Sequence, residues 1–405
     1  MATITQTIPG GVTAALGFRA AGISAGIKAN GNPDLALLVS DVPAQAAAVF
    51  TTNKATAAPV IVSREHLSRS GGLARAIVIN SGCANACTGA DGLAAAREMT
   101  AATAGLAGCP VEQVLVASTG VIGVALPIQK LRDGLPAAFR ALGTDPAHAA
   151  LAARAIMTTD PFPKESAAQI AIGGLDVRIG GMAKGSGMIE PMMATMLGFV
   201  TTDAAVPKPL LDRALREAVD DTFNAITVDG ECSTNDCVML LANGASGAAV
   251  DESSYGVFVA GLTAVCHELA LGIVRGGEGA TKLVKVTVTG GATSGDARKA
   301  AKAIANSLLV KTAIHGGDPN WGRLIAVAGR AGVAFNLSRA AVLIGSTVLF
   351  RNGRPYDEAA PEAAAYLQGK DLAVSVDLGA GAQSSTVWTC DLSAEYVRIN
   401  ADYRT

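Results

Sequence analysis

Charged side chains are scarce in this sequence. Only 16% of its 405 residues are Asp, Glu, Lys or Arg, 50% are apolar, and the formal net charge is -2. No Lys/Arg-rich run interleaved with aromatic residues occurs, which argues against a nucleic-acid partner. The high apolar content favours an oligomer, in which copies of the chain cover part of one another's surface.

Long apolar runs and a basic leader are also missing. Runs such as AAVLIGSTVLF fall well short of the ~18 residues needed to cross a bilayer. The first residues, MATITQTIPGGVTAALGFRAAG, are broken by Pro9 and the two glycines that follow it, and they reach a positive charge only at Arg19, unlike a signal peptide. These features predict a cytoplasmic protein.

Metal-ligand patterns are absent as well. The seven cysteines are an odd number spread along a long chain, which predicts reduced thiols and no disulfide framework. Cys83, Cys87, Cys232 and Cys237 lack the paired spacing and the nearby histidines of a zinc site, so we expect small buried side chains. The four histidines form no local cluster. We therefore predict no metal.

What is present is an alternation of strands and helices. Short β-branched runs predict strands, Ala-rich periodic segments predict helices, and the strands end in turns rich in Gly, Asn, Ser and Thr. Expected strands cover 35–40, 74–80, 114–119 and 284–291, expected helices cover 92–108, 145–159, 208–226 and 296–316, two strands joined by an Asn-Gly turn are expected in 340–360, and 391–405 is expected to be strand-like.

The length predicts more than one core. We expect a main α/β domain, residues 1–281, a smaller α/β subdomain, residues 282–385, and a C-terminal segment, residues 386–405. The polar turns after the strands carry most of the residues that could do chemistry.

A lone hydroxyl inside an apolar run is the first chemical feature. Thr195 lies in KGSGMIEPMMATMLGFV, residues 184–200. It could be an ordinary strand residue that hydrogen-bonds to a neighbouring carbonyl. It could instead be a nucleophile, if the peptide bond after Ala194 were cut, because the freed α-amine, with a pKa of ~7.7–8.0, would act as a base beside the hydroxyl. The residues permit self-cleavage without establishing it.

Long motifs along essentially the whole chain resemble those of the ornithine acetyltransferase family. They include GGMAKGSGMIEPMMATML around Thr195, with AAVFTTNKATAAPV, NSGCANACTG, STGVIG, MTTDPFPK, TVDGECSTNDCV, GGEGATK, KTAIHGGDPNWGR and CDLSAEYVRINADYRT. The resemblance implies an α/β fold, a layered α-β-β-α sandwich of the type shared with aminopeptidases, with a second, smaller α/β subdomain. It also implies cleavage between Ala194 and Thr195 into an α chain and a β chain.

The activity implied by this resemblance is N-acetyl transfer in arginine biosynthesis. In such enzymes the freed threonine takes the acetyl group of N2-acetyl-L-ornithine as an ester and passes it to L-glutamate, in a ping-pong cycle. The family implies an α2β2 heterotetramer of processed chains and no cofactor. Some members also use acetyl-CoA as the donor, and no nucleotide-cradling motif decides whether this chain does.

Three more residues acquire roles from the resemblance. Thr119 and Gly120 match the family's oxyanion-hole pair, where glycine lets donors approach a developing negative oxygen closely. Lys184 matches a substrate contact, for which the α-carboxylate shared by ornithine and glutamate is a suitable partner. The alternatives are an ordinary strand-ending turn and a solvated surface lysine.

Further substrate contacts are implied at a distance along the chain. Thr158 and Thr159 match the family's substrate-binding threonine segment, with helix capping as the alternative and the contacting residue undecided. Glu278 would receive a substrate amino group, and its alternative is a loop salt bridge with Arg275 or Lys282.

The C-terminal contacts implied by the resemblance are Asn400 and Thr405, which require a docked tail because chain ends usually fray. We interpret DPNWGR, residues 318–323, as a structural loop that packs one subdomain on the other. Three polar residues of TVDGECSTND either shape the site or terminate strands: Asp229, Asn235 and Asp236.

Two other functions are compatible with the sequence. One is an N-terminal-threonine aminopeptidase or amidase, in which water replaces the acceptor amine. The other is a non-enzymatic ligand-binding or assembly protein, in which Thr195 is only a strand residue.

Overall fold

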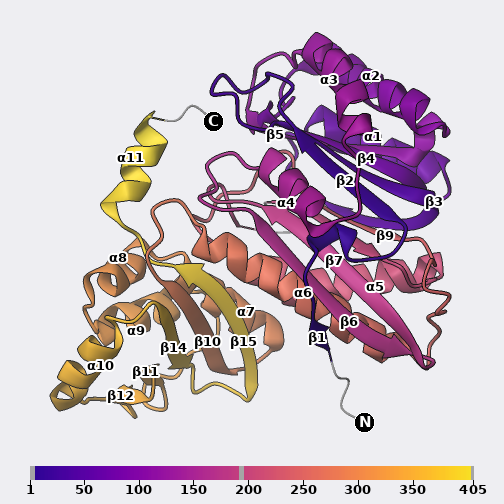
Figure 1. Cartoon of the computed structure of the whole chain (residues 1–405). Helices are drawn as coiled ribbons and strands as arrows, with labels where there is room; N and C mark the ends of the chain where they lie inside the picture. Colours follow the sequence, from indigo (N-terminus) through magenta and orange to yellow (C-terminus); the bar gives the residue numbers. More distant parts are fainter. Residues whose placement is uncertain (1–4, 191–195, 403–405) are drawn as a thin grey trace. The chain divides into compact units, whose positions relative to one another are not determined.

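The computed structural model describes residues 5–190 and 196–402, which form two compact units (Figure 1). The first unit takes in the chain up to residue 224 and residues 231–273, and the second takes in residues 225–230 and 274 onward. The predicted subdomain 282–385 lies inside the second unit. Each unit is described below by itself.

The first unit is built on a sheet of nine strands among its described residues, in the order β1-β6-β7-β8-β9-β3-β4-β5, with β2 beside β3. Strands β8 and β9 are parallel to each other, as are β4 and β5, and the other neighbours are antiparallel. The strands are β1 (Gln6–Thr7), β2 (Phe18–Ile23), β3 (Leu35–Phe50), β4 (Leu73–Cys83), β5 (Val114–Val121), β6 (Lys164–Ile172), β7 (Leu175–Lys184), β8 (Leu197–Thr202) and β9 (Cys237–Ala242).

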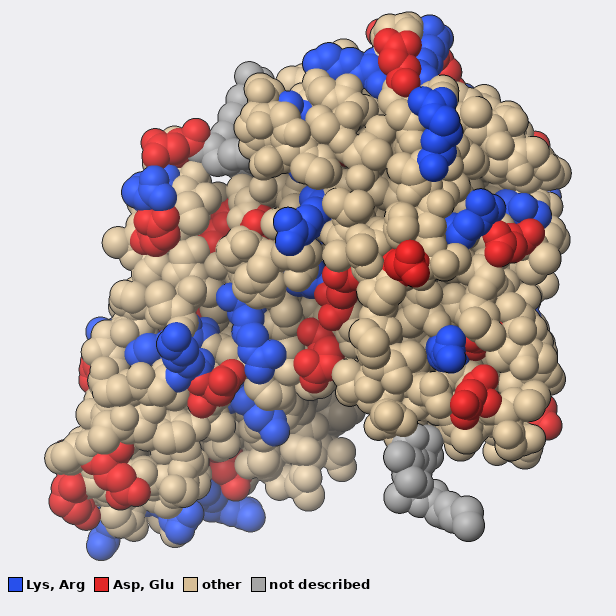
Figure 2. Space-filling model, viewed as in Figure 1, with Lys and Arg blue, Asp and Glu red and all other residues tan. Residues whose placement is uncertain are grey.

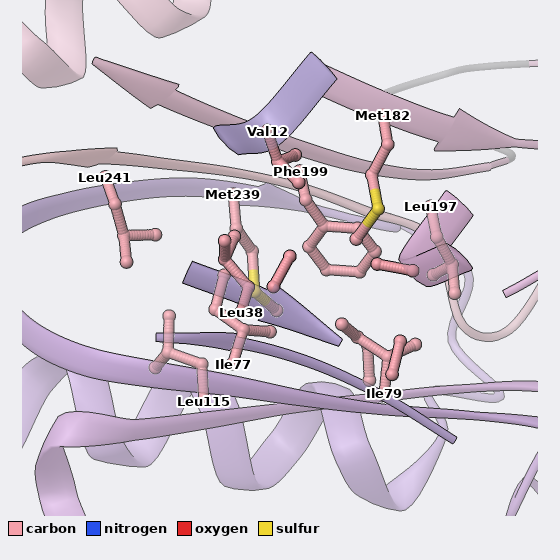
Figure 3. Close-up of a cluster of buried hydrophobic side chains, with 14 of the residues drawn as sticks. Val12, Leu38, Ile77, Ile79, Leu115, Met182, Leu197, Phe199, Met239 and Leu241 are labelled. Carbon is pink, nitrogen blue, oxygen red and sulfur yellow. The ribbon is translucent and has the colours of Figure 1, made fainter. Parts of the chain in front are cut away.

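The long strand β3 turns this sheet into two facing layers. Its register against β4 shifts between Val39 and Ala44, so that its first half pairs with β2 and its second half with β9. Apolar side chains from the two layers meet in one core (Figure 3). Ile77, Ile79 and Leu115 on β4 and β5 lie opposite Met182, Phe199 and Met239 on β7, β8 and β9. The apolar alternation of these strands is what this sandwich buries.

Helices form the two outer layers of the first unit. Three helices pack on the far face of β3, β4 and β5, against Leu37, Val78 and Val116. On the other side, α6 lies on β6 and β7, where a side chain at Gly261 would meet Ile170 and Ile179. The helices are α1 (Ala58–Arg69), α2 (Gly89–Ala107), α3 (Ile128–Arg140), α4 (Pro146–Ala155), α5 (Lys208–Asp221) and α6 (Tyr255–Arg275), with 3-10 turns at Gly11–Thr13, Val111–Gln113 and Phe223–Ala225. The predicted α-β-β-α layering is confirmed.

The second unit is a smaller α/β unit, as predicted. Its sheet has the order β13-β12-β11-β14-β10-β15, with β10 parallel to β14 and antiparallel to β15. Helices α7 and α9 contribute to its core. Its strands are β10 (Leu283–Gly291), β11 (Ala341–Ile344), β12 (Thr347–Arg351), β13 (Arg354–Pro355), β14 (Asp371–Asp377) and β15 (Gln383–Cys390), and its helices are α7 (Ser294–Ala305), α8 (Leu308–Gly316), α9 (Trp321–Arg330), α10 (Ala360–Tyr366) and α11 (Ala394–Asp402), with a 3-10 turn at Asp357–Ala359.

Two local predictions for the second unit are wrong, and a third, the Asn-Gly turn between two strands, is confirmed with one further strand, β11, before them. The helix expected over 296–316 is two helices, because the Ser307 side chain accepts a hydrogen bond from Val310 N and starts α8. The Asn352-Gly353 turn, with φ of 52° and 75°, joins β12 to the short β13, while β11 and β12 are joined at Gly345 and Ser346. The end of the chain forms helix α11 where we expected a strand.

Helix α6 alone among the described helices is long and apolar enough to cross a membrane by length and composition. Its apolar residues Phe258, Leu262 and Leu269 are nevertheless buried within the fold. A core helix of this kind meets the same criteria, so packing on β6 and β7 accounts for its composition. On the face shown in Figure 2, basic and acidic side chains are interspersed on a largely uncharged surface, in agreement with the small net charge.

Candidate active site

The end of strand β5 requires glycine at position 120. Gly120 pairs with Gly82 of the neighbouring β4 and has φ of 125°, a value that L side chains rarely adopt. A Cβ at this position would lie 2.4 Å from the carbonyl carbon of Gly82 and 2.6 Å from the nitrogen of Cys83. The close approach of two backbones therefore explains this glycine, which follows the nearly buried Thr119.

The last residue of β7 brings its charge to the end of β5. Lys184 pairs with Leu197 at the start of β8, and its Nζ donates a hydrogen bond of 3.2 Å to Oγ1 of Thr119, 65 residues away in sequence. Its side chain is buried, so the solvated surface lysine that was its alternative is wrong. The structure thus brings together two of the predicted site residues.

A buried carboxylate joins the two loops beside Lys184. Oδ1 of Asp160 accepts hydrogen bonds from Gly185 N at 2.8 Å and from Lys164 Nζ at 2.5 Å, and Oδ2 accepts one from Thr158 N at 3.0 Å. The side chains of Asp160 and Lys164 are 0% and 1% exposed. This one carboxylate therefore fixes the Thr158 loop against the end of β7.

The charges in this cluster hold Asp160 ionised. Burial raises the pKa of Asp160, but the charges of Lys184 and Lys164, with hydrogen bonds from Lys164 and Thr158, outweigh burial and hold that pKa at about 2. Burial lowers the pKa of Lys164 although Asp160 opposes it. The pKa of Lys28 is also lowered, by burial and then by Lys184, against the opposing charges of Asp34 and Asp160.

Thr158 and Thr159 lie in the half-buried loop that follows α4. Because this helix ends before its C-cap residue Ile156, neither threonine stands at a helix N-terminus, and the capping alternative is wrong. Which of the two contacts substrate stays open.

Glu278 and Asn400 meet within the second unit. Nδ2 of Asn400 donates a 2.7 Å hydrogen bond to Oε2 of Glu278, which is 6% exposed. Within the described residues the alternative partners of this carboxylate are engaged elsewhere: Arg275 contacts Asp371, and Lys282 donates to two carbonyls of α8 and to the carbonyl of Leu367, just after α10. A carboxylate and an amide oxygen together suit an amino group.

Three predicted site residues lie outside the described residues: Ala194, Thr195 and Thr405. The loop 318–323 makes contacts within the second unit, and its expected role in packing one subdomain on the other stays a prediction. Asn320 caps α9, Trp321 stacks on Phe350 with ring centroids 5.0 Å apart, and Arg323 donates to Leu309 O.

Sequence reasoning missed Asp160, Lys164 and Lys28 as members of the site. The first two lie in the motif MTTDPFPK at a spacing of four residues, which was the available signal. Asn235 also acts at the site, because its amide donates to Ala84 O and Ser118 O and so ties the end of β5 to the segment before β9.

The seven cysteines are free thiols. Cys83 and Cys237 are buried as expected, whereas Cys87 is exposed and Cys232 is half-buried, so the expectation of burial is wrong for these two. Across residues 5–190 and 196–402, no group of three or more His, Cys, Asp or Glu side chains could hold a metal ion.

The layered first unit carries a buried cluster in which Lys184 contacts Thr119 and Lys164 is paired with Asp160. The ArgJ family matches residues 19–405. The arginine biosynthesis bifunctional protein ArgJ of Symbiobacterium thermophilum is 51% identical over 407 residues, which cover 99% of this chain and 100% of that protein. The chain therefore belongs to the ArgJ family and is an enzyme of arginine biosynthesis, as the motifs predicted.

Two solved structures are also similar. One is the ArgJ protein of Bacillus halodurans, 41% identical, with a TM-score of 0.45 over 48% of this chain and 100% of that chain. The other is the ornithine acetyltransferase of Mycobacterium tuberculosis in complex with ornithine, 41% identical, with a TM-score of 0.43 over 46% of this chain and 97% of that chain.

Proposed function

We propose that this enzyme transfers an acetyl group from N2-acetyl-L-ornithine to L-glutamate through an ester on Thr195. The observation that carries the proposal is the hydrogen bond from Lys184 to Thr119. Lys184 pairs with Leu197 at the start of β8, and Leu197 comes two residues after Thr195 in the chain. The names of the curated relatives support the pathway, and the ornithine complex of the mycobacterial relative supports the substrate class.

Self-cleavage prepares the nucleophile. The Thr195 hydroxyl oxygen attacks the carbonyl carbon of Ala194, the C–N bond breaks, and the resulting ester is hydrolysed by water. The products are an α chain that ends at Ala194 and a β chain with a free α-amine on Thr195. With a pKa of ~7.7–8.0 in unperturbed peptides, that amine can act as the base for its own hydroxyl.

Acetyl transfer then takes two half-reactions. The Thr195 oxygen attacks the acetyl carbonyl carbon of N2-acetylornithine, and ornithine leaves with a proton. The glutamate amine next attacks the acetyl ester, and N-acetylglutamate leaves. Each half-reaction develops a negative oxygen, which Thr119 and Gly120 would stabilise. Because Lys184 donates to Oγ1 of Thr119, the Thr119 hydroxyl proton is available to donate to that oxygen.

The charge balance of the cluster suits a substrate carboxylate. The ammonium groups of Lys28, Lys164 and Lys184 interact with the carboxylates of Asp34 and Asp160, which leaves one positive charge in excess among these groups. Lys164 is paired directly with Asp160, whereas Lys184 contacts a neutral hydroxyl. Lys184 is therefore the cation we assign to the α-carboxylate that ornithine and glutamate share.

The amino group of the substrate would be bound by Glu278, which Asn400 holds in place. Thr158 or Thr159, and Thr405, complete the proposed substrate contacts. We also propose cytoplasmic location, an α2β2 assembly of the processed chains, and no cofactor; the assay below measures whether acetyl-CoA serves as a second donor.

Purified enzyme with N2-acetyl-L-ornithine tests this function directly. Formation of N-acetylglutamate that depends on added glutamate is the expected result. Release of acetate at the same rate with and without glutamate would identify a hydrolase instead. A parallel incubation of glutamate with acetyl-CoA measures the second donor.

Replacing Gly120 with alanine is expected to lower kcat of the cleaved enzyme by about 10²–10³-fold. The added methyl group must displace the Gly82–Cys83 backbone, which moves the oxyanion donors. Gly123→Ala is a matched control in the turn that follows β5, because Gly123 also has positive φ, 78°, but its Cβ would meet nothing within 4 Å. Steady-state kinetics compare the two variants. Equal kcat values would refute the proposed role of Gly120.

A further inference from the structure

A buried carboxylate lies at the base of α11. Asp391 follows β15 directly, precedes α11 by three residues, and has a side chain that is 0% exposed. Its Oδ1 accepts hydrogen bonds from the backbone nitrogens of Thr281, at 2.8 Å, and Lys282, at 2.9 Å. Its Oδ2 accepts one from the Thr281 hydroxyl at 2.5 Å and lies 2.7 Å from Nδ1 of His315. One side chain therefore joins the loop before β10, residues 276–282, to the segment that leads into α11.

These contacts leave Asp391 no capacity to bind substrate. Burial raises the pKa of Asp391, but hydrogen bonds from Thr281, His315 and Lys282 outweigh burial and lower that pKa below its usual value. The group is therefore a carboxylate at neutral pH, and a carboxylate has about four acceptor positions. Because donors of the protein occupy them, the role of Asp391 is to hold the chain in place.

The same loop also contacts α11 itself. The Ser393 hydroxyl donates a 2.6 Å hydrogen bond to Gly279 O. Gly279 has φ of 68°, and a Cβ on it would lie 2.5 Å from the backbone nitrogen of Tyr396, so the loop backbone lies against the first turn of the helix. Farther along the helix, Nδ2 of Asn400 donates to Oε2 of Glu278 at 2.7 Å. The loop and the helix are thus joined along their length.

Helix α11 depends on this loop for its place. None of its nine residues is buried, and an isolated helix of this length is marginal in water. Besides the loop contacts, Tyr396 donates a 3.2 Å hydrogen bond to Asp229. The distance between Asn400 and Glu278 therefore depends on Asp391, which fixes the start of the helix and the loop at once.

We propose that Asp391 is the positioning residue of the amino-group site formed by Glu278 and Asn400. By fixing the loop to the start of α11, it holds these two side chains in one geometry before the substrate arrives. A site ordered in advance loses less conformational entropy when its ligand binds. The inference rests on the proposed function, because it takes Glu278 as the group that binds the substrate amino group.

Asp391→Asn tests the assignment in the full-length enzyme. The amide nitrogen of asparagine cannot accept a hydrogen bond, so the contacts on one oxygen are lost and Glu278 shifts with the loop. In a ping-pong reaction kcat/KM is measured separately for N2-acetyl-L-ornithine and for L-glutamate. We expect Asp391→Asn to lower kcat/KM about 10–100-fold for the same substrate that Glu278→Gln affects, mainly through a higher KM, since a misplacement of about 1 Å can cost about 10²-fold.

The double variant separates positioning from a general loss of structure. Once Glu278→Gln has removed the carboxylate that Asp391 positions, adding Asp391→Asn should lower kcat/KM by less than about twofold more. A merely structural role would instead produce the full loss in both backgrounds, and that outcome would overturn the assignment. Wild-type kcat/KM in Asp391→Asn alone would overturn it as well.

The matched control is Asp377→Asn. Asp377 ends β14 in the same sheet, is half-buried, and its Oδ1 accepts a 2.8 Å hydrogen bond from Gly379 N. It supports a different loop of the same unit, so kcat/KM for both substrates should stay near the wild-type values. A loss as large as that of Asp391→Asn would contradict the assignment.

Gly279→Ala moves the same loop without changing the buried carboxylate, so it gives a result even if Asp391→Asn fails to fold. Its methyl group must displace the first turn of α11, and we expect a loss of kcat/KM that again disappears in the Glu278→Gln background. Gly353→Ala is its control, because Gly353 of the same unit has φ of 75° but a Cβ there would meet nothing within 4 Å. Equal kinetics of these two glycine variants would refute the inference.

Failure of the proposed function itself would look different. A wild-type enzyme that forms no glutamate-dependent N-acetylglutamate would refute that function. Wild-type kcat/KM of Glu278→Gln for both substrates would refute the role of Glu278 and, with it, the role of Asp391.

Discussion

Replacement of Thr195 by alanine is expected to leave one intact polypeptide of 40.6 kDa and to reduce acetyl transfer by at least about 10⁴-fold. Alanine has no hydroxyl, so neither the attack on Ala194 nor the acetyl ester can form. Denaturing electrophoresis and mass analysis of the wild-type protein should instead show two fragments of similar size, one of which begins TMLGFV.

Thr195→Ser is the control for this variant. Serine keeps a hydroxyl on the same carbon and the same backbone nitrogen, so cleavage and part of the acetyl transfer should survive. Cleavage that persists in Thr195→Ala would remove the basis for a threonine nucleophile. Loss of activity in an alanine variant that is still cleaved would point to a different role for this side chain.

Replacement of Asp160 by asparagine is expected to destabilise the first unit by about 3–5 kcal/mol, because it leaves the buried Lys164 ammonium without its counter-ion. The amide also cannot accept all three hydrogen bonds that now reach the carboxylate from Thr158, Gly185 and Lys164. Chemical denaturation measures the stability. We further expect a higher KM for both substrates, since Lys184 and the Thr158 loop lose their common support.

Asp212→Asn is a matched control for Asp160→Asn. Asp212 and Lys208 have the same spacing of four residues and the same 2.5 Å separation as Asp160 and Lys164, but their side chains are 29% and 34% exposed. Solvated pairs of this kind contribute about 0–1 kcal/mol. A loss of stability as small in Asp160→Asn as in Asp212→Asn would contradict the structural role of the buried pair.

The same carboxylate predicts how acid affects the fold. The pKa of Asp160 is held at about 2 in the folded state, below the value of 3.8 expected when unfolded. The unfolded chain therefore takes up a proton first as pH falls, and the folded state loses stability between about pH 4 and pH 2. The contribution above that range is about 2 kcal/mol. In Asp160→Asn this part of the acid dependence should disappear from equilibrium unfolding curves.

Local pattern was enough to predict most elements of the fold. The apolar strands of the first unit and the helices at 92–108, 145–159 and 208–226 occur close to where their periodicity put them. Two of the errors concern helices. Ser307 starts a new helix inside a periodic segment, and the alternating pattern of 391–402 forms helix α11.

The candidate site was predicted unequally. The motifs supplied Thr119, Gly120 and Lys184, since each lies in a distinctive run of residues. The part played by Asp160 was missed, because an Asp-Pro pair in a loop has the sequence of an ordinary turn. Only burial, and the approach of lysines from β6 and β7, makes this carboxylate a fixed charge at the centre of the site.

The sequence by itself determined the family, the α/β class and the residue types available for chemistry, because these depend on local periodicity and on motifs that are contiguous in the chain. The tertiary structure decided which of those residues meet, how deeply they are buried and which charges compensate one another. Lys184 contacts Thr119 across 65 residues, and Asp160 joins the loop after α4 to the end of β7. The physical reason is that desolvation and charge pairing depend on groups brought together from distant strands, and no local pattern specifies that geometry.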